Sequence, residues 1–152
     1  MNNYIYPGAQ ILTPYLNITD CRSAIEFYKK AFNAKEILIL DMPDGKIGHA
    51  ELDIYGGRLM LAEENPSWGT KSPQTLGGTA SGIGLYVEDV DTVFAQAIAA
   101  GATQTMPIED QFYGDRTGAI MDPFGHKWTI ATHKEDVTHE EMQKRMKELF
   151  TK

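Results

Sequence analysis

Residues 83–90 read Ile-Gly-Leu-Tyr-Val-Glu-Asp-Val, and this stretch decides the fold because it joins a strand to a helix. Larger apolar side chains alternate with glycine and tyrosine up to Val87, which is typical of a strand with one buried face. Asp89 then suits the N-cap of a helix over 90–100, which Gly101 ends. The stretch therefore predicts a strand followed directly by a helix.

Three more strands are predicted after this helix, at 104–108, 116–121 and 127–132, and the turn Asp122-Pro123-Phe124-Gly125 joins the last two. The first half of the chain has the same order. It contains a strand at 10–18 with Leu12, Leu16 and Ile18 on one face, a helix at 21–32 capped by Asp20, and strands at 35–42, 46–55 and 58–63.

The repeated order predicts an α+β fold in which two tandem βαβββ modules form a cupped mixed sheet. We expect one domain over residues 1–152, with module one at about 8–64 and module two at about 81–133. Residues 65–80 are rich in Gly, Pro, Ser and Thr and are predicted to be a linker. A C-terminal helix is expected at about 138–150, where Thr138 and Glu141 form a capping box.

The composition excludes several partners. Lys and Arg number 14 and Asp and Glu number 21, so 14 minus 21 gives a net charge of −7, which argues against nucleic acid and anionic membranes. The single cysteine, Cys21, has no disulfide partner in the chain and is expected to be structural. Neither a signal peptide nor an apolar run long enough to cross a bilayer is apparent, so we expect a cytoplasmic protein.

Four motifs carry a resemblance to a known family. They are Tyr15-Leu16 through Ala24-Ile25-Glu26-Phe27-Tyr28, the Val87–Asp91 segment, the Gln111–Gly118 segment and the Asp122–Trp128 segment. In this order they resemble the vicinal oxygen chelate superfamily of glyoxalase I, bleomycin-resistance proteins and extradiol dioxygenases, most closely its PhnB-like branch. The resemblance implies the tandem-module fold and a homodimer, but it does not imply one activity.

Enzymes of that superfamily hold a divalent metal at four strand positions, which correspond here to Thr13, Leu61, Gly82 and Thr129. These residues offer only two hydroxyl groups, which are poor ligands. A shift of two residues would replace Leu61 by Glu63, which does not repair the other positions. We therefore expect no metal at this site and no other cofactor.

Alternation predicts which side chains face the open side of the sheets. A ligand cavity is expected to be lined by Thr13, Tyr15, His49, Glu51, Tyr86 and Thr129, with Tyr113 and Arg116 near its mouth. His49 and Glu51 form the only local pair suited to general base catalysis. Arg116 is also suited to a structural ion pair with Asp115, Glu109 or Asp122.

Three functions stay open at this point. The first is a binding protein that holds a small aromatic or anionic molecule without chemistry. The second is an isomerase or lyase with a non-standard site around His49 and Glu51. The third is a dimeric scaffold without catalytic activity.

Overall fold

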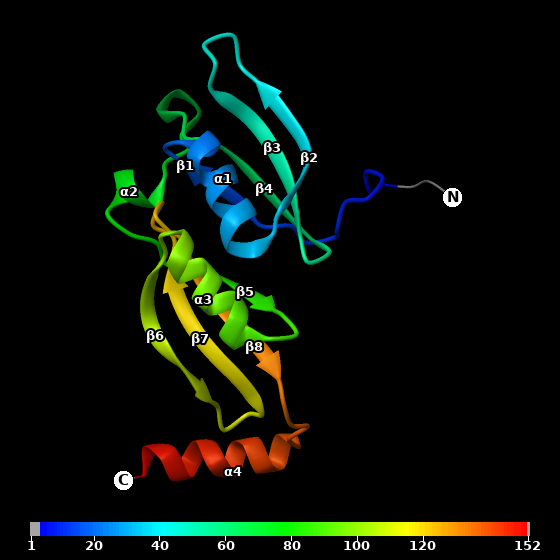
Figure 1. Ribbon diagram of the computed structural model, residues 1–152, viewed down its shortest axis with the longest axis vertical. Helices are drawn as coiled ribbons and strands as arrows, with labels where there is room; N and C mark the ends of the chain where they lie inside the picture. Colours follow the sequence, from blue (N-terminus) through cyan, green and yellow to red (C-terminus); the bar gives the residue numbers. More distant parts are fainter. Residues whose placement is uncertain (1–3, 152) are drawn as a thin grey trace.

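The computed structural model describes residues 4–151 and contains the βαβββ unit twice (Figure 1). The first module comprises β1 (Tyr15–Ile18), α1 (Cys21–Phe32), β2 (Lys35–Asp41), β3 (Ile47–Ile54) and β4 (Gly57–Glu63). The second comprises β5 (Gly82–Tyr86), α3 (Val90–Ala100), β6 (Thr103–Asp110), β7 (Asp115–Met121) and β8 (Lys127–His133). A short helical turn η1 (Pro66–Trp68) and helix α2 (Pro73–Leu76) lie between them, and α4 (His139–Phe150) follows. The predicted fold class is confirmed.

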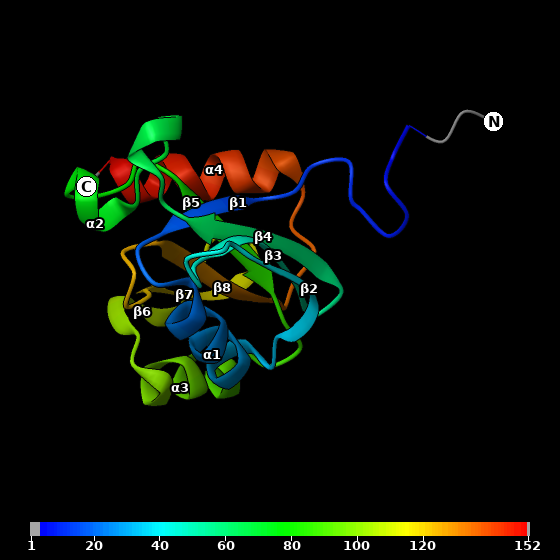
Figure 2. The same cartoon turned by 90° about the horizontal axis from the view of Figure 1, so that it is seen from above.

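Each module forms a four-stranded mixed sheet, in the orders β1-β4-β3-β2 and β5-β8-β7-β6. The first strand of each module runs parallel to the last, and the other pairs are antiparallel. Helices α1 and α3 lie side by side on one side of the two sheets (Figure 2). The opposite face of each sheet is therefore left open within the chain.

The two helices begin where the sequence predicts, because the caps supply hydrogen-bond acceptors. Asp20 accepts from the backbone N–H of Ser23, and Asp89 accepts from that of Thr92. The apolar stripe of α1 is buried, and it includes Ala24, Ile25, Phe27, Tyr28, Ala31 and Phe32. Burial of this stripe against the sheet and α3 stabilises the first module through the hydrophobic effect.

A buried aromatic cluster joins the modules. Trp128 of β8 lies with its ring centroid 4.8 Å from that of Phe32 and 5.5 Å from that of Tyr28, both on α1. The Tyr28 hydroxyl donates to Asp122 Oδ2 at 2.7 Å, and Trp128 Nε1 donates to the same oxygen at 3.0 Å. Asp122 is 4% exposed, so this turn between β7 and β8 is anchored in the interface between modules.

Two predictions about the first strand are wrong. The first strand begins at Tyr15 instead of residue 10, and Leu12 is 86% exposed instead of buried. Pro14 precedes the strand and lacks a backbone N–H for the ladder, which accounts for the late start. Residues 4–14 instead form an arm without strand structure that leads away from the sheets toward the N-terminus (Figures 1 and 2), and its Gln10 accepts a hydrogen bond from the backbone N–H of Arg58 at 3.3 Å.

The C-terminal helix lies beyond the β6–β7 turn, away from the first module (Figure 1). Arg145 fixes it there by donating to the carbonyl of Phe112 at 3.1 Å and pairing with Glu135, and within the helix it also pairs with Glu141. None of its described residues is buried, and Phe150 is 82% exposed. Among residues 4–151, no helix has the length and apolar character needed to span a membrane.

Candidate functional site

Three of the predicted site residues meet on the open face of the first sheet. Tyr15 begins β1, while His49 and Glu51 lie two residues apart on β3. The Tyr15 hydroxyl lies 2.9 Å from His49 Nδ1, and His49 Nε2 lies 3.1 Å from Glu51 Oε1. The three side chains therefore form one continuous hydrogen-bonded row.

Arg58 of β4 completes this row and was not predicted from the sequence. Its Nη1 donates to Glu51 Oε2 at 2.5 Å, so the two carboxylate oxygens of Glu51 have separate partners. The side chains of Arg58 and Glu51 are only 9% and 7% exposed. The sequence feature that could have revealed Arg58 is the hairpin turn Gly56-Gly57, because this turn brings β4 back beside β3.

The row determines which nitrogen of His49 carries a proton. Glu51 accepts hydrogen bonds only, so His49 Nε2 must be the protonated nitrogen that donates to it. His49 Nδ1 then accepts from the Tyr15 hydroxyl. Burial raises the pKa of Tyr15, and the neighbouring Cys21 and Glu51 raise it further, so this hydroxyl keeps its proton at neutral pH.

Apolar side chains border the row on its β2 side. Leu38 pairs in register with Glu51 and Leu40 with His49, which puts them on the same face of the sheet. Leu38 is 36% exposed and Leu40 is 51% exposed, while Tyr15 is 49% exposed. The open face therefore combines an aromatic ring and two leucines with a fixed polar row beneath them.

Tyr86 and Thr129 lie on the second sheet, so one chain does not bring them beside His49. The Tyr86 hydroxyl donates to Asp115 Oδ2 at 2.5 Å, and His133 Nδ1 lies 2.8 Å from Asp115 Oδ1. Burial raises the pKa of Asp115, but the hydrogen bonds from Tyr86 and His133 outweigh it and leave this pKa lowered. Thr129 is exposed on the same open face, where its neighbour Gly84 adds no side chain.

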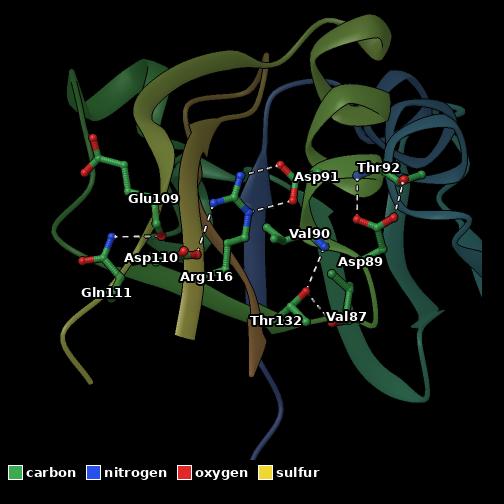
Figure 3. A network of polar contacts seen from close by, with 10 residues as sticks. All are labelled: Val87, Asp89, Val90, Asp91, Thr92, Glu109, Asp110, Gln111, Arg116 and Thr132. Atoms are coloured by element: carbon green, nitrogen blue, oxygen red, sulfur yellow. Dashed lines mark hydrogen bonds and ion pairs between the residues drawn. The ribbon is translucent and has the colours of Figure 1, made fainter. Parts of the chain in front are cut away.

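Arg116 lines a cavity of about 480 Å³ beside the β6–β7 turn, on the second sheet and not on the sheet that carries His49. Its Nε and Nη2 each donate to Asp91 of α3 at 2.8 Å, and Nη1 donates to Asp110 at 3.2 Å (Figure 3). Arg116 therefore does form a structural ion pair, as the second interpretation predicted. Its partners are Asp91 and Asp110 instead of Asp115, Glu109 or Asp122. Tyr113 lies in the β6–β7 turn, partly buried, with its ring centroid 5.2 Å from that of Phe112. Thr13 lies outside β1 and donates to the carbonyl of Gln10.

The residues at the four positions that the resemblance implies for a metal offer few ligand groups. Leu61 is fully buried on the helix side of β4, so the open face at this point belongs to Met60 and Ala62 instead. Gly82 has no side-chain donor, and Thr13 and Thr129 contribute only hydroxyls. Among residues 4–151, no group of three or more His, Cys, Asp or Glu is placed to hold a metal ion.

The comparisons with known proteins agree with this fold. The family model described as Glyoxalase/Bleomycin resistance protein/Dioxygenase superfamily matches residues 10–130. An uncharacterized protein from Mycobacterium bovis is 46% identical over 138 residues, which cover 89% of this chain and 91% of the relative.

Solved structures give the same result. TioX from Micromonospora sp. ML1 has a TM-score of 0.64 and 28% identity, covering 85% of this chain and 100% of TioX. A PhnB protein from Bacillus cereus has a TM-score of 0.62 at 21% identity, covering 81% of this chain and 99% of that one, and it supports the fold alone. The chain belongs to the glyoxalase/bleomycin resistance protein/dioxygenase superfamily.

Proposed function

We propose that this protein binds a small molecule on the open face of its first sheet, through Tyr15, His49 and Glu51, without a metal at the superfamily position. The observation that carries the proposal is the row from Tyr15 to Arg58. Two charged groups are buried in it at 7% and 9% exposure, although burying an ion pair is costly and seldom improves stability. The pair holds His49 and Tyr15 in fixed orientations, which is what a binding site requires.

The chemistry of this face favours a flat or partly aromatic ligand that carries a polar group. The Tyr15 ring and the side chains of Leu38 and Leu40 offer apolar contact, and these groups are at least one-third exposed. The Tyr15 oxygen donates its one proton to His49, so its lone pairs are available to accept a hydrogen bond from a ligand.

We also propose that the protein is a homodimer in solution. The open sheet faces, the exposed apolar residues of α4 and the sheet edges all leave surface that a second copy can cover. In such a dimer, the open face of the second sheet, which carries Thr129, can come from the other subunit and complete the cavity. Sedimentation that gives only a 16.9 kDa species at micromolar concentration would contradict the dimer.

A thermal-shift screen against aromatic and anionic metabolites tests the binding function, because a ligand of the folded state raises the melting temperature. The shift produced by a hit should be lost in His49→Ala and kept in His139→Ala, a matched change at an exposed position on α4. Equal shifts in both variants would refute the site. A screen without any hit would favour the scaffold function.

Proton transfer is the second candidate function, and the direction of the hydrogen bonds favours it. If a substrate gives a proton to the Tyr15 oxygen, the Tyr15 proton passes to His49 Nδ1, and Glu51 stabilises the imidazolium that forms. Return of the proton to another carbon would complete an isomerisation. A carbonyl compound found by the screen should then exchange its α-hydrogens with deuterated water in the wild type and not in Tyr15→Phe.

A further inference from the structure

A cavity lies where the β3–β4 turn meets the end of β5, and none of its lining residues belongs to the Tyr15–Arg58 row. It has a volume of about 910 Å³ and takes lining residues from both modules. Tyr55 comes from the β3–β4 turn of module one, and Tyr86, Glu88 and His133 come from module two. Its volume is within the range of roughly 300–1,000 Å³ that small-molecule sites occupy.

Tyr55 is an unusual residue for its position. It has φ of 52° and is followed by Gly56 with φ of 84°, which is the left-handed pair of a tight hairpin turn. Asn-Gly is the preferred sequence for such a turn, and a bulky side chain in the left-handed region is strained. Local conformation therefore does not account for a tyrosine here.

The tyrosine ring is nevertheless held in place. Asn33, which ends α1, donates from Nδ2 to the Tyr55 hydroxyl at 3.2 Å. Gln96 of α3 donates to Asn33 Oδ1 at 3.0 Å, so the tether spans both modules. The ring remains 48% exposed at the cavity, where Tyr86 is 65% exposed.

The charges around the cavity are mostly negative. Glu88 and Asp89 line it, and hydrogen bonds from Thr92 lower the pKa of Asp89, which keeps that group a carboxylate. Glu88 has no ionic partner among residues 4–151. The one basic lining group, His133, already lies between the carboxylates of Asp115 and Asp136, each at 2.8 Å.

We propose that this cavity is a second binding site, separate from the first, for a flat organic cation. Two tyrosine rings with exposed surface attract a cation through their π-faces, and the free Glu88 carboxylate complements its charge. An anionic ligand would meet unpaired negative charge, which opposes its binding.

Three probes that share one indole ring test the proposal on the full-length protein. Tryptamine is a cation, tryptophol is neutral and indole-3-acetate is an anion. Titrations followed in amide NMR spectra should give affinity in the order tryptamine, tryptophol, indole-3-acetate, with shift changes at Tyr55, Tyr86 and Glu88 and none at His49. Failure of tryptamine to bind, tighter binding of indole-3-acetate, or shifts confined to the His49 face would overturn the proposal.

Two substitutions separate binding from structure. Tyr55→Asn should weaken tryptamine binding about tenfold by removing the ring, while the melting temperature stays equal or rises because asparagine suits the turn. Glu88→Gln should reduce the preference for tryptamine over tryptophol. Unchanged tryptamine affinity in Tyr55→Asn, or a lowered melting temperature, would mean that Tyr55 is kept for structural reasons and would refute the site. The site around His49 is unaffected by either outcome.

Discussion

Replacement of Arg58 by Met tests the buried row at the proposed binding face. Met has a similar length but no charge, so the change leaves the carboxylate of Glu51, 7% exposed, without its cation. Breaking a buried pair in this way typically costs about 3–5 kcal/mol. Glu51 retains the hydrogen bond from His49 at 3.1 Å, so we expect a loss near the lower end, about 3 kcal/mol. Urea denaturation at neutral pH measures it as a lower midpoint with an unchanged slope.

Two controls make this result specific. Arg22 pairs with Asp41 on the surface, where the side chains are 57% and 56% exposed, so Arg22→Met should cost less than about 1 kcal/mol. The double variant Glu51→Leu, Arg58→Met removes both buried charges and should recover most of the loss. A loss below about 1 kcal/mol in Arg58→Met, or a double variant no more stable than the single one, would refute the reasoning.

Three further changes have defined outcomes. Tyr28→Phe removes one hydrogen bond to Asp122, which still accepts from Phe124 and Trp128. Chemical denaturation should show that the free energy of unfolding falls by about 1.5 kcal/mol. An unchanged free energy of unfolding would contradict the role of Asp122 as an anchor between the modules. Hydrogen bonds to Asp115 and then Asp136 raise the pKa of His133, so its stabilising contribution is complete below about pH 6.5 and is lost as the pH rises through the raised value. The difference in melting temperature between wild type and His133→Gln should therefore shrink at alkaline pH. A difference that grows with pH would contradict a stabilising role for protonated His133. Burial raises the pKa of Cys21 to about 12, so a thiol reagent should not modify the native protein, while rapid modification would contradict the buried assignment.

Local patterns predicted much of the fold. The caps at Asp20 and Asp89 and the alternation of β3 depend on residues close in sequence, and the structure agrees with them. The alternation that put His49 and Glu51 on the open face is correct, since the residues that alternate with them, Ala50 and Leu52, are fully buried. A repeat of two such units leads directly to two sheets, each with one covered face.

The errors concern contacts between distant segments. Motif spacing put a metal position at Leu61, which is fully buried on the helix side, and a shift of one residue reverses the face in any strand. Arg58 was missed because its pairing with Glu51 depends on how β3 and β4 align. The acidic partner of Arg116 was missed because Asp91 lies 25 residues away in the sequence, on α3. Only the packed structure brings these groups together.

The central claim is that the open face of the first sheet binds a small molecule without a metal. Its most direct test maps a thermal-shift hit onto the protein by amide NMR, with a chelator present throughout. We predict shift changes centred on Tyr15, His49 and Glu51, unchanged by the chelator. Loss of binding on chelation, or shift changes confined to regions outside this face, would contradict the claim.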